Sequence, residues 1–122
     1  MLDAALILLL IAVLFGSWLA VLHFAGRTAE RAPWPLALMH AGLALIGLVL
    51  LAVTLRGPAH GADQGMAGFG ITAAGLLAVA AIVGAQIFVR FRLRRKSAGA
   101  LVGIHAALAV SGIVILAAYV LS

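Results

Sequence analysis

The chain has 122 residues, of which 66% are hydrophobic and 9% charged, and its mean hydropathy is +1.29. Folding in water would leave most of this apolar surface exposed, so lipid is the expected solvent and a soluble globular domain is excluded. The net charge of +5 would suggest a nucleic-acid partner in a soluble protein, but here the charges lie between apolar runs and report topology. The absence of cysteine excludes disulfides, thiolate metal sites and covalently attached c-type haem.

Four apolar runs cover approximately residues 3–25, 34–55, 66–91 and 98–121. A bilayer core about 30 Å thick needs about 20 apolar residues per spanning helix, and each run is long enough. Uninterrupted apolar runs without in–out alternation exclude a barrel. We therefore predict an all-α integral membrane protein, an up-down four-helix bundle forming one domain over residues 1–122. The first run has no basic leader, so we expect it to be retained rather than cleaved as a signal peptide.

Basic residues are concentrated in two of the three connectors. The first connector carries Arg27 and Arg31, the second carries only Arg56 beside Asp63, and the third is flanked by five cationic residues: Arg90, Arg92, Arg94, Arg95 and Lys96. The positive-inside rule then predicts that the first and third connectors are cytoplasmic. Both termini would face the opposite side, which is the periplasm if the membrane is a bacterial inner membrane.

An internal repeat relates the second and fourth runs. Shifting the chain by 65 residues places 36–52 on 101–117 with nine of seventeen positions identical. The rare His40 coincides with His105, and Gly47 with Gly112. The first and third runs align poorly at this offset, so the repeat predicts a duplicated two-helix hairpin whose trace survives in the even-numbered spans.

The repeat gives the two histidines a chemical interpretation. Both spans start on the same side of the membrane, so His40 and His105 are expected at one depth, roughly 10 Å below the surface. In an up-down bundle these spans are diagonal, with the interior between them. Two imidazoles facing each other there can bind the iron of one haem b from both sides, which makes His40 and His105 the predicted metal ligands.

Small residues beside the histidines suit a flat macrocycle. Ala41 and Gly42 follow the first histidine and Ala106 follows the second, where a larger side chain would collide with a porphyrin. Gly47 and Gly112, two turns further on, would let the macrocycle or a neighbouring helix approach the backbone.

The shared His-Ala-x-Leu-Ala-x-x-Gly pattern at His40 and His105 resembles the four-helix membrane b-type cytochromes, whose haems are held by paired histidines on bundle helices. The resemblance implies single-electron transfer, with quinone in the adjacent lipid as an exchange partner and an unidentified redox partner. Two-haem members carry two layers of ligands, whereas this chain shows one layer, so the resemblance implies at most one haem.

Other polar residues have two interpretations each. His23, nearer the end of its span, is an alternative ligand, a propionate partner or proton relay, or simply an interfacial residue. Gln86 could orient a ligand imidazole or make a plain interhelical hydrogen bond. Arg90, Arg92 and the first-connector arginines are candidates to pair with haem propionates. His60 is expected to be an ordinary loop residue.

Competing functions remain open at this point. The two histidines could merely brace helices by bonding to backbone or to Ser111, or hold another pigment. The chain would then be an accessory subunit of a larger membrane complex, and the Gly99–Gly103 pair also suits packing between protomers in a homo-oligomer. A proton-coupled transporter is disfavoured because no acidic residue lies deep in a span, and hydrolytic or phosphoryl-transfer motifs are absent. Any enzymatic activity would be that of an oxidoreductase.

Overall fold

The computed structural model describes residues 1–26, 34–93, 95 and 99–122. Within them lie four long helices, α1 (Leu2–Phe24), α2 (Trp34–Thr54), α3 (Phe69–Arg92) and α4 (Gly99–Leu121), and a short 3₁₀ turn, η1 (Ala62–Gln64). All four long helices are long and apolar enough to cross a membrane, as an integral membrane protein requires. Their bounds agree with the predicted runs within three residues, the largest difference being the start of α3.

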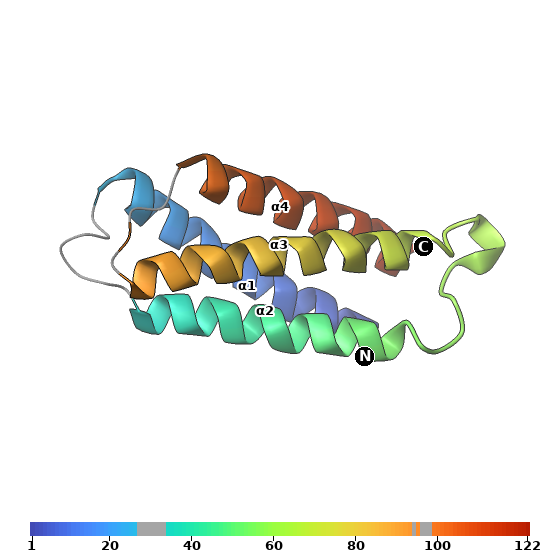
Figure 1. Ribbon diagram of the computed structural model, residues 1–122. Coiled ribbons are helices and arrows are strands. Elements are labelled where there is room, and N and C mark those ends of the chain that lie inside the picture. Colours follow the sequence, from blue (N-terminus) through green and yellow to red (C-terminus); the bar gives the residue numbers. More distant parts are fainter. Residues whose placement is uncertain (27–33, 94, 96–98) are drawn as a thin grey trace.

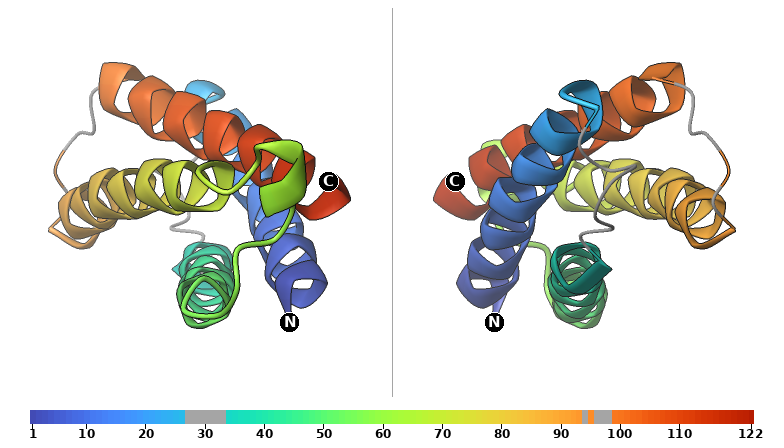
Figure 2. Two further views of the ribbon diagram at one scale, coloured as in Figure 1. Left: turned by 90° about the vertical axis from the view of Figure 1, so that its right-hand side faces the viewer. Right: turned by 90° about the vertical axis from the view of Figure 1, so that its left-hand side faces the viewer.

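The helices form a four-helix bundle of two hairpins. The chain passes back and forth along the bundle, with both termini and the α2–α3 loop at one end (Figure 1). The most extensive packing joins α1 to α2 and α3 to α4, while α1–α4 and α2–α3 contacts hold the hairpins together. Viewed along the bundle, α2 is nearly end-on whereas the other helices run obliquely, so the helices are inclined to one another (Figure 2).

Buried side chains are gathered toward the end that carries the termini, which we call the terminal half. Leu51 and Leu116 are the largest fully buried side chains, and Tyr119 is 3% exposed. Alanines and glycines on the facing helices allow this close packing, as is usual where lipid rather than water surrounds a bundle. Many larger apolar side chains, such as Leu14 and Ile82, are exposed and suit contact with acyl chains.

The loop between α2 and α3 is attached to the terminal half through Tyr119. The backbone N–H of His60 donates to the Tyr119 hydroxyl at 3.0 Å, and the two rings meet edge to face at 5.6 Å. Gly61 and Gly65, on either side of η1, both have positive φ, which glycine adopts without strain. His60 itself is exposed and lies in the loop, as expected.

Candidate functional site

His40 and His105 meet across the bundle interior. Their ring centroids are 6.0 Å apart and the ring planes are inclined at 84°. The backbones of α2 and α4 make no direct contact in the described structure, so these rings reach toward each other from diagonal helices. Each histidine is the seventh residue of its helix, as the 65-residue repeat predicts, and each ring is half-buried.

A backbone carbonyl of the partner helix in each hairpin fixes each ring. His40 Nδ1–H donates to the carbonyl oxygen of Ala12 in α1 at 2.7 Å, and His105 Nδ1–H donates to that of Ala80 in α3 at 2.7 Å. A carbonyl oxygen can only accept, so the proton of each neutral ring lies on Nδ1. Nε2 of both rings is consequently the nitrogen with a free lone pair.

A glycine lies against each imidazole. A Cβ added at Gly16 would be 2.8 Å from Cε1 of His40, and one added at Gly84 would be 2.8 Å from Cε1 of His105. Each glycine stands one helical turn after the carbonyl that its histidine reaches. A side chain there would cover that carbonyl, so glycine is what allows the ring to approach the backbone.

Two turns beyond the histidines the same pairing recurs. A Cβ at Gly47 would lie 2.7 Å from Cγ of Leu9, and one at Gly112 would lie 2.7 Å from Cγ of Leu77. Of the two uses predicted for Gly47 and Gly112, the structure shows close approach of the neighbouring helix. Both glycines are buried.

The other small residues of the predicted site lie closer to the surface. Ala41 and Ala106 are exposed, and Gly42 is half-buried, with open space where a side chain would begin. Their predicted part in accommodating a macrocycle stays a prediction.

The polar candidates lie apart from the imidazole nitrogens. Gln86 is exposed and bonds to neither ring among the described residues; the carbonyls of Ala12 and Ala80 orient the rings instead. His23 is half-buried near the end of α1, with its ring edge-on to Phe24 at 5.2 Å. Arg90 is exposed in the last turn of α3, and its pairing with a propionate stays a prediction. Arg27 and Arg31 lie outside the described residues.

Two imidazole nitrogens, one from each histidine, are the protein groups that could bind a metal at this site. No group of three or more His, Cys, Asp or Glu side chains suited to a metal ion occurs within the part of the chain that the structure describes. A pair of imidazoles alone is too small a set for a metal centre built from protein ligands, which usually has at least three of them. Two imidazoles are sufficient for a metal ion that is already bound in the plane of a macrocycle.

Comparison of the chain with known protein families, with curated proteins and with solved structures gives no match. The imidazole pair and the contacts that hold it are therefore the basis for assigning a function.

Sequence reasoning missed the odd-numbered helices' part of the site. Shifting the chain by 68 residues, rather than 65, superposes the α1 residues that contact α2 on the α3 residues that contact α4, with identical residues at four positions: Ala5 on Ala73, Leu9 on Leu77, Ala12 on Ala80 and Gly16 on Gly84. Their spacing of four, three and four residues marks one helix face. A search with a separate offset for each helix would have found them.

Proposed function

We propose that this protein is a membrane b-type haem protein that carries single electrons, with one haem b held between His40 of α2 and His105 of α4. The observation that carries the proposal is the imidazole pair: two rings with centroids 6.0 Å apart and planes inclined at 84°, each with its Nδ1–H donating to a carbonyl and its Nε2 left to bind a metal.

The spacing of the rings suits axial ligation of one iron atom. An imidazole–metal bond is about 2.0 Å, and adding about 1.1 Å from Nε2 to the ring centre places two opposed ring centroids about 6 Å apart. The observed separation is 6.0 Å. A porphyrin supplies four equatorial nitrogens, so two protein donors complete the coordination.

The contacts around the rings are those that tune an axial histidine. A hydrogen bond from Nδ1–H to a carbonyl fixes the ring orientation and raises the basicity of Nε2. In a bilayer the site would be surrounded by apolar helices and acyl chains, where the local dielectric is low. When bound, the haem would supply a one-electron couple, and two axial imidazoles would leave no iron position for oxygen, which favours electron transfer over oxygenase chemistry.

The exchange partner in this proposal is a quinone dissolved in the surrounding lipid, with a second redox protein not identified. The site lies in the half of the bundle nearer the arginine-bearing end of α3. By the positive-inside rule that end would face the cytoplasm and both termini the periplasm of a bacterial inner membrane.

Duplication of one helical hairpin explains the paired contacts. In each hairpin the histidine bonds to an alanine carbonyl and packs against a glycine one turn later. The sets are Ala12, Gly16 and His40 in the first hairpin and Ala80, Gly84 and His105 in the second, with equal hydrogen-bond lengths. The change from a 68-residue to a 65-residue offset corresponds to a connector shorter by three residues in the second hairpin. We infer that the two-fold repeat supplied the two matched ligands.

A bracing role in an accessory subunit is the competing proposal, and one observation favours it. Each histidine already makes an interhelical bond to backbone, which is what bracing requires, whereas Ser111 is exposed and bonds to neither ring. Bracing uses Nδ1 alone and gives no reason for two rings to meet at 6.0 Å with Nε2 free.

Absorption spectra of detergent-purified protein, oxidised and dithionite-reduced, test the haem proposal. Protein produced with ample haem should give low-spin b-type bands that sharpen on reduction. His40→Ala and His105→Ala should each lose the low-spin spectrum, because each removes one axial ligand. His60→Ala is the matched control, since His60 belongs to the α2–α3 loop, which lies at the opposite end of the bundle, and it should leave the bands unchanged.

A further variant, His23→Ala, separates the two candidate ligands of the first hairpin. Unchanged bands in His23→Ala and lost bands in His40→Ala would assign the ligand to α2. A featureless visible spectrum in the haem-supplied wild-type protein would refute the haem proposal and leave the bracing role.

A further inference from the structure

A groove of about 580 Å³ lies along the end of α3, separate from the histidines. Its walls are apolar, from Ile82, Val89 and Leu93, while Gln86, Arg90 and Arg95 supply its polar groups. Among the described residues that line it, none is acidic. The groove is shallow and open, and it combines apolar walls with a cationic end.

The groove opens toward the lipid. Ile82, Gln86, Val89 and Leu93 recur at spacings of three and four residues and so share one face of the helix. The α4-contacting face, which includes Gly84, is on the opposite side of α3, since Gly84 lies two residues from Ile82 and from Gln86. Ile82 is 61% and Leu93 59% exposed, as expected for side chains that meet acyl chains.

The chain beyond α3 folds back to complete the cationic end. Leu93 N–H donates to the carbonyl of Val89 at 2.9 Å, and Arg95 N–H donates to the carbonyl of Arg90 at 2.8 Å. A bond that reaches back five residues is typical of a helix C-terminus that turns sharply. It returns Arg95 to the groove that Arg90 lines, so two arginines contribute to the cationic end of one groove.

Gln86 supplies a third recognition element at a greater depth. It precedes Arg90 by four residues, which places it about 6 Å deeper along the helix. Its amide is exposed on a lipid-facing surface, where an unpaired polar group is unfavourable. Glycerol ester groups lie below the phosphate of a phospholipid and can accept from this amide.

We propose that this groove binds an anionic phospholipid, with its phosphodiester between Arg90 and Arg95, its ester region at Gln86 and an acyl chain along Ile82, Val89 and Leu93. Guanidinium groups form strong paired hydrogen bonds to phosphate oxygens. A zwitterionic lipid would bring its own cation beside the arginines, so a headgroup with net negative charge is preferred. The outward direction of the groove favours a lipid over a group held between the histidines.

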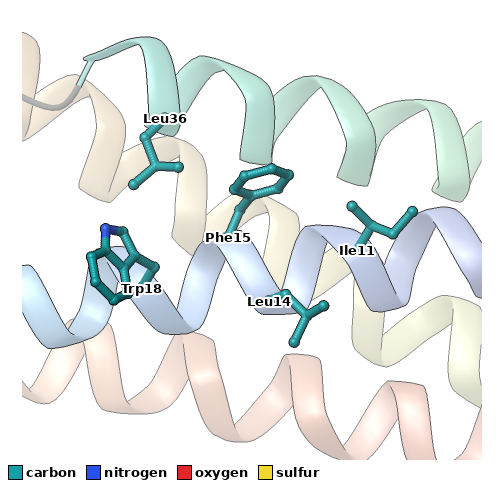
Figure 3. Close-up of a pocket in the computed structure, with 5 residues that line it drawn as sticks. All are labelled: Ile11, Leu14, Phe15, Trp18 and Leu36. Carbon is teal, nitrogen blue, oxygen red and sulfur yellow. The ribbon is translucent and has the colours of Figure 1, made fainter.

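The repeat provides a natural comparison within the same molecule. The corresponding region of α1 forms a groove of about 470 Å³ whose residues are Ile11, Leu14, Phe15, Trp18 and, from α2, Leu36 (Figure 3). Trp18 stands where α3 has Gln86 in the 68-residue alignment. That groove has an indole N–H as its polar side-chain group and carries no charge, so it suits acyl chains without selecting a headgroup.

Native mass spectrometry of the detergent-purified protein, titrated with dioleoyl phosphatidylglycerol or dioleoyl phosphatidylcholine, tests the proposal. The wild-type protein should prefer phosphatidylglycerol by about tenfold, since each arginine near the surface contributes a severalfold attraction. Arg90→Gln and Arg95→Gln should each reduce this preference severalfold, and the double variant should abolish it. Gln86→Leu should weaken binding of both lipids.

Arg92→Gln is the matched control because Arg92 is also exposed in the last turn of α3, yet does not line the groove. It removes the same charge at the same end and should retain the preference. Equal loss in Arg92→Gln would overturn the proposal in favour of non-specific attraction to the cationic end. Equal binding of the two lipids by the wild-type protein would overturn it by showing that the headgroup charge is not recognised. Displacement of the lipid by millimolar inorganic phosphate would overturn it in favour of a phosphate-ion site. Arg95 lies beyond the end of α3, so Arg95→Gln should fold normally. It tests the proposal even if Arg90→Gln fails to fold.

Discussion

The two halves of this bundle are built differently. The terminal half holds both fully buried large side chains, Leu51 and Leu116, together with Tyr119. In the histidine half, which comprises residues 13–24, 34–46, 81–92 and 99–111, Val102 is the one buried residue among those described. Side-chain burial therefore separates the two halves.

The difference predicts that stability and the proposed function depend on different halves of the bundle. In lipid, helices associate through close packing rather than escape from water, so the tightly packed terminal half contributes most of the cohesion. The histidine half instead places hydrogen-bonded rings and glycines around the bundle interior. Substitutions in one half should therefore affect unfolding, and substitutions in the other should affect ligand binding.

The largest expected effect is on unfolding, in Leu51→Ala and Leu116→Ala. These residues are related by the 65-residue repeat and are both 0% exposed. Each substitution should lower the free energy of unfolding by about 2 kcal/mol, the low end of the range for soluble proteins, because the transfer from water is missing and the packing loss remains. Denaturation in mixed detergent with an increasing fraction of dodecyl sulfate measures the free energy of unfolding.

The repeat also supplies the control for that pair. Val49 and Val114 occupy repeat-related positions that are 53% and 62% exposed. Val49→Ala and Val114→Ala should change the unfolding free energy by less than about 0.5 kcal/mol. Similar losses at buried and exposed positions would mean that cohesion does not depend on the terminal half.

The fold was largely predictable because membrane spans have a strong signal. Residues 34–55 were predicted and α2 is Trp34–Thr54, and the prediction for the first span differs from α1 by one residue at each end. The third span was placed too early, at Met66, because Met66 and Ala67 are as apolar as a span requires. The structure instead continues the loop past η1 to the start of α3 at Phe69.

The site was predictable in part. A histidine is rare in a membrane span, so its recurrence after 65 residues located His40 and His105. Their partners Ala12 and Ala80 could not be found by composition, because their contribution is a backbone carbonyl that every residue possesses. Gly16 and Gly84 had a sequence signal, but at an offset of 68 residues that a single shift does not reveal.

A second prediction concerns the histidine half, where Gly84→Ala should act on haem binding rather than on unfolding. Its new Cβ would lie 2.8 Å from Cε1 of His105, so the ring must move off its carbonyl. We expect haem affinity about tenfold weaker, or about 1.4 kcal/mol, and a smaller low-spin fraction. Gly16→Ala should act in the same way on His40. Haem titration followed by absorption measures both.

Gly75→Ala in the same helix is the control for that experiment. Open space surrounds the position of its added Cβ, so the substitution should raise helix stability by up to about 1 kcal/mol and leave haem binding unchanged. Full haem affinity in Gly84→Ala would indicate that the carbonyl bond is dispensable. Weaker affinity in Gly75→Ala would indicate that any added methyl group disturbs the site.

The smallest expected effect is that of Tyr119→Phe, which tests whether the two halves are independent. The substitution removes the hydroxyl that accepts the His60 N–H but keeps the buried ring. The expected loss is about 1 kcal/mol in unfolding free energy, with faster hydrogen exchange in the α2–α3 loop measured by mass spectrometry. The haem spectrum should not change, because Tyr119 lies fourteen residues beyond His105, about 21 Å along α4. A shifted spectrum in Tyr119→Phe would show that packing at the terminal end controls the geometry of the rings, and that the division between the halves is incomplete.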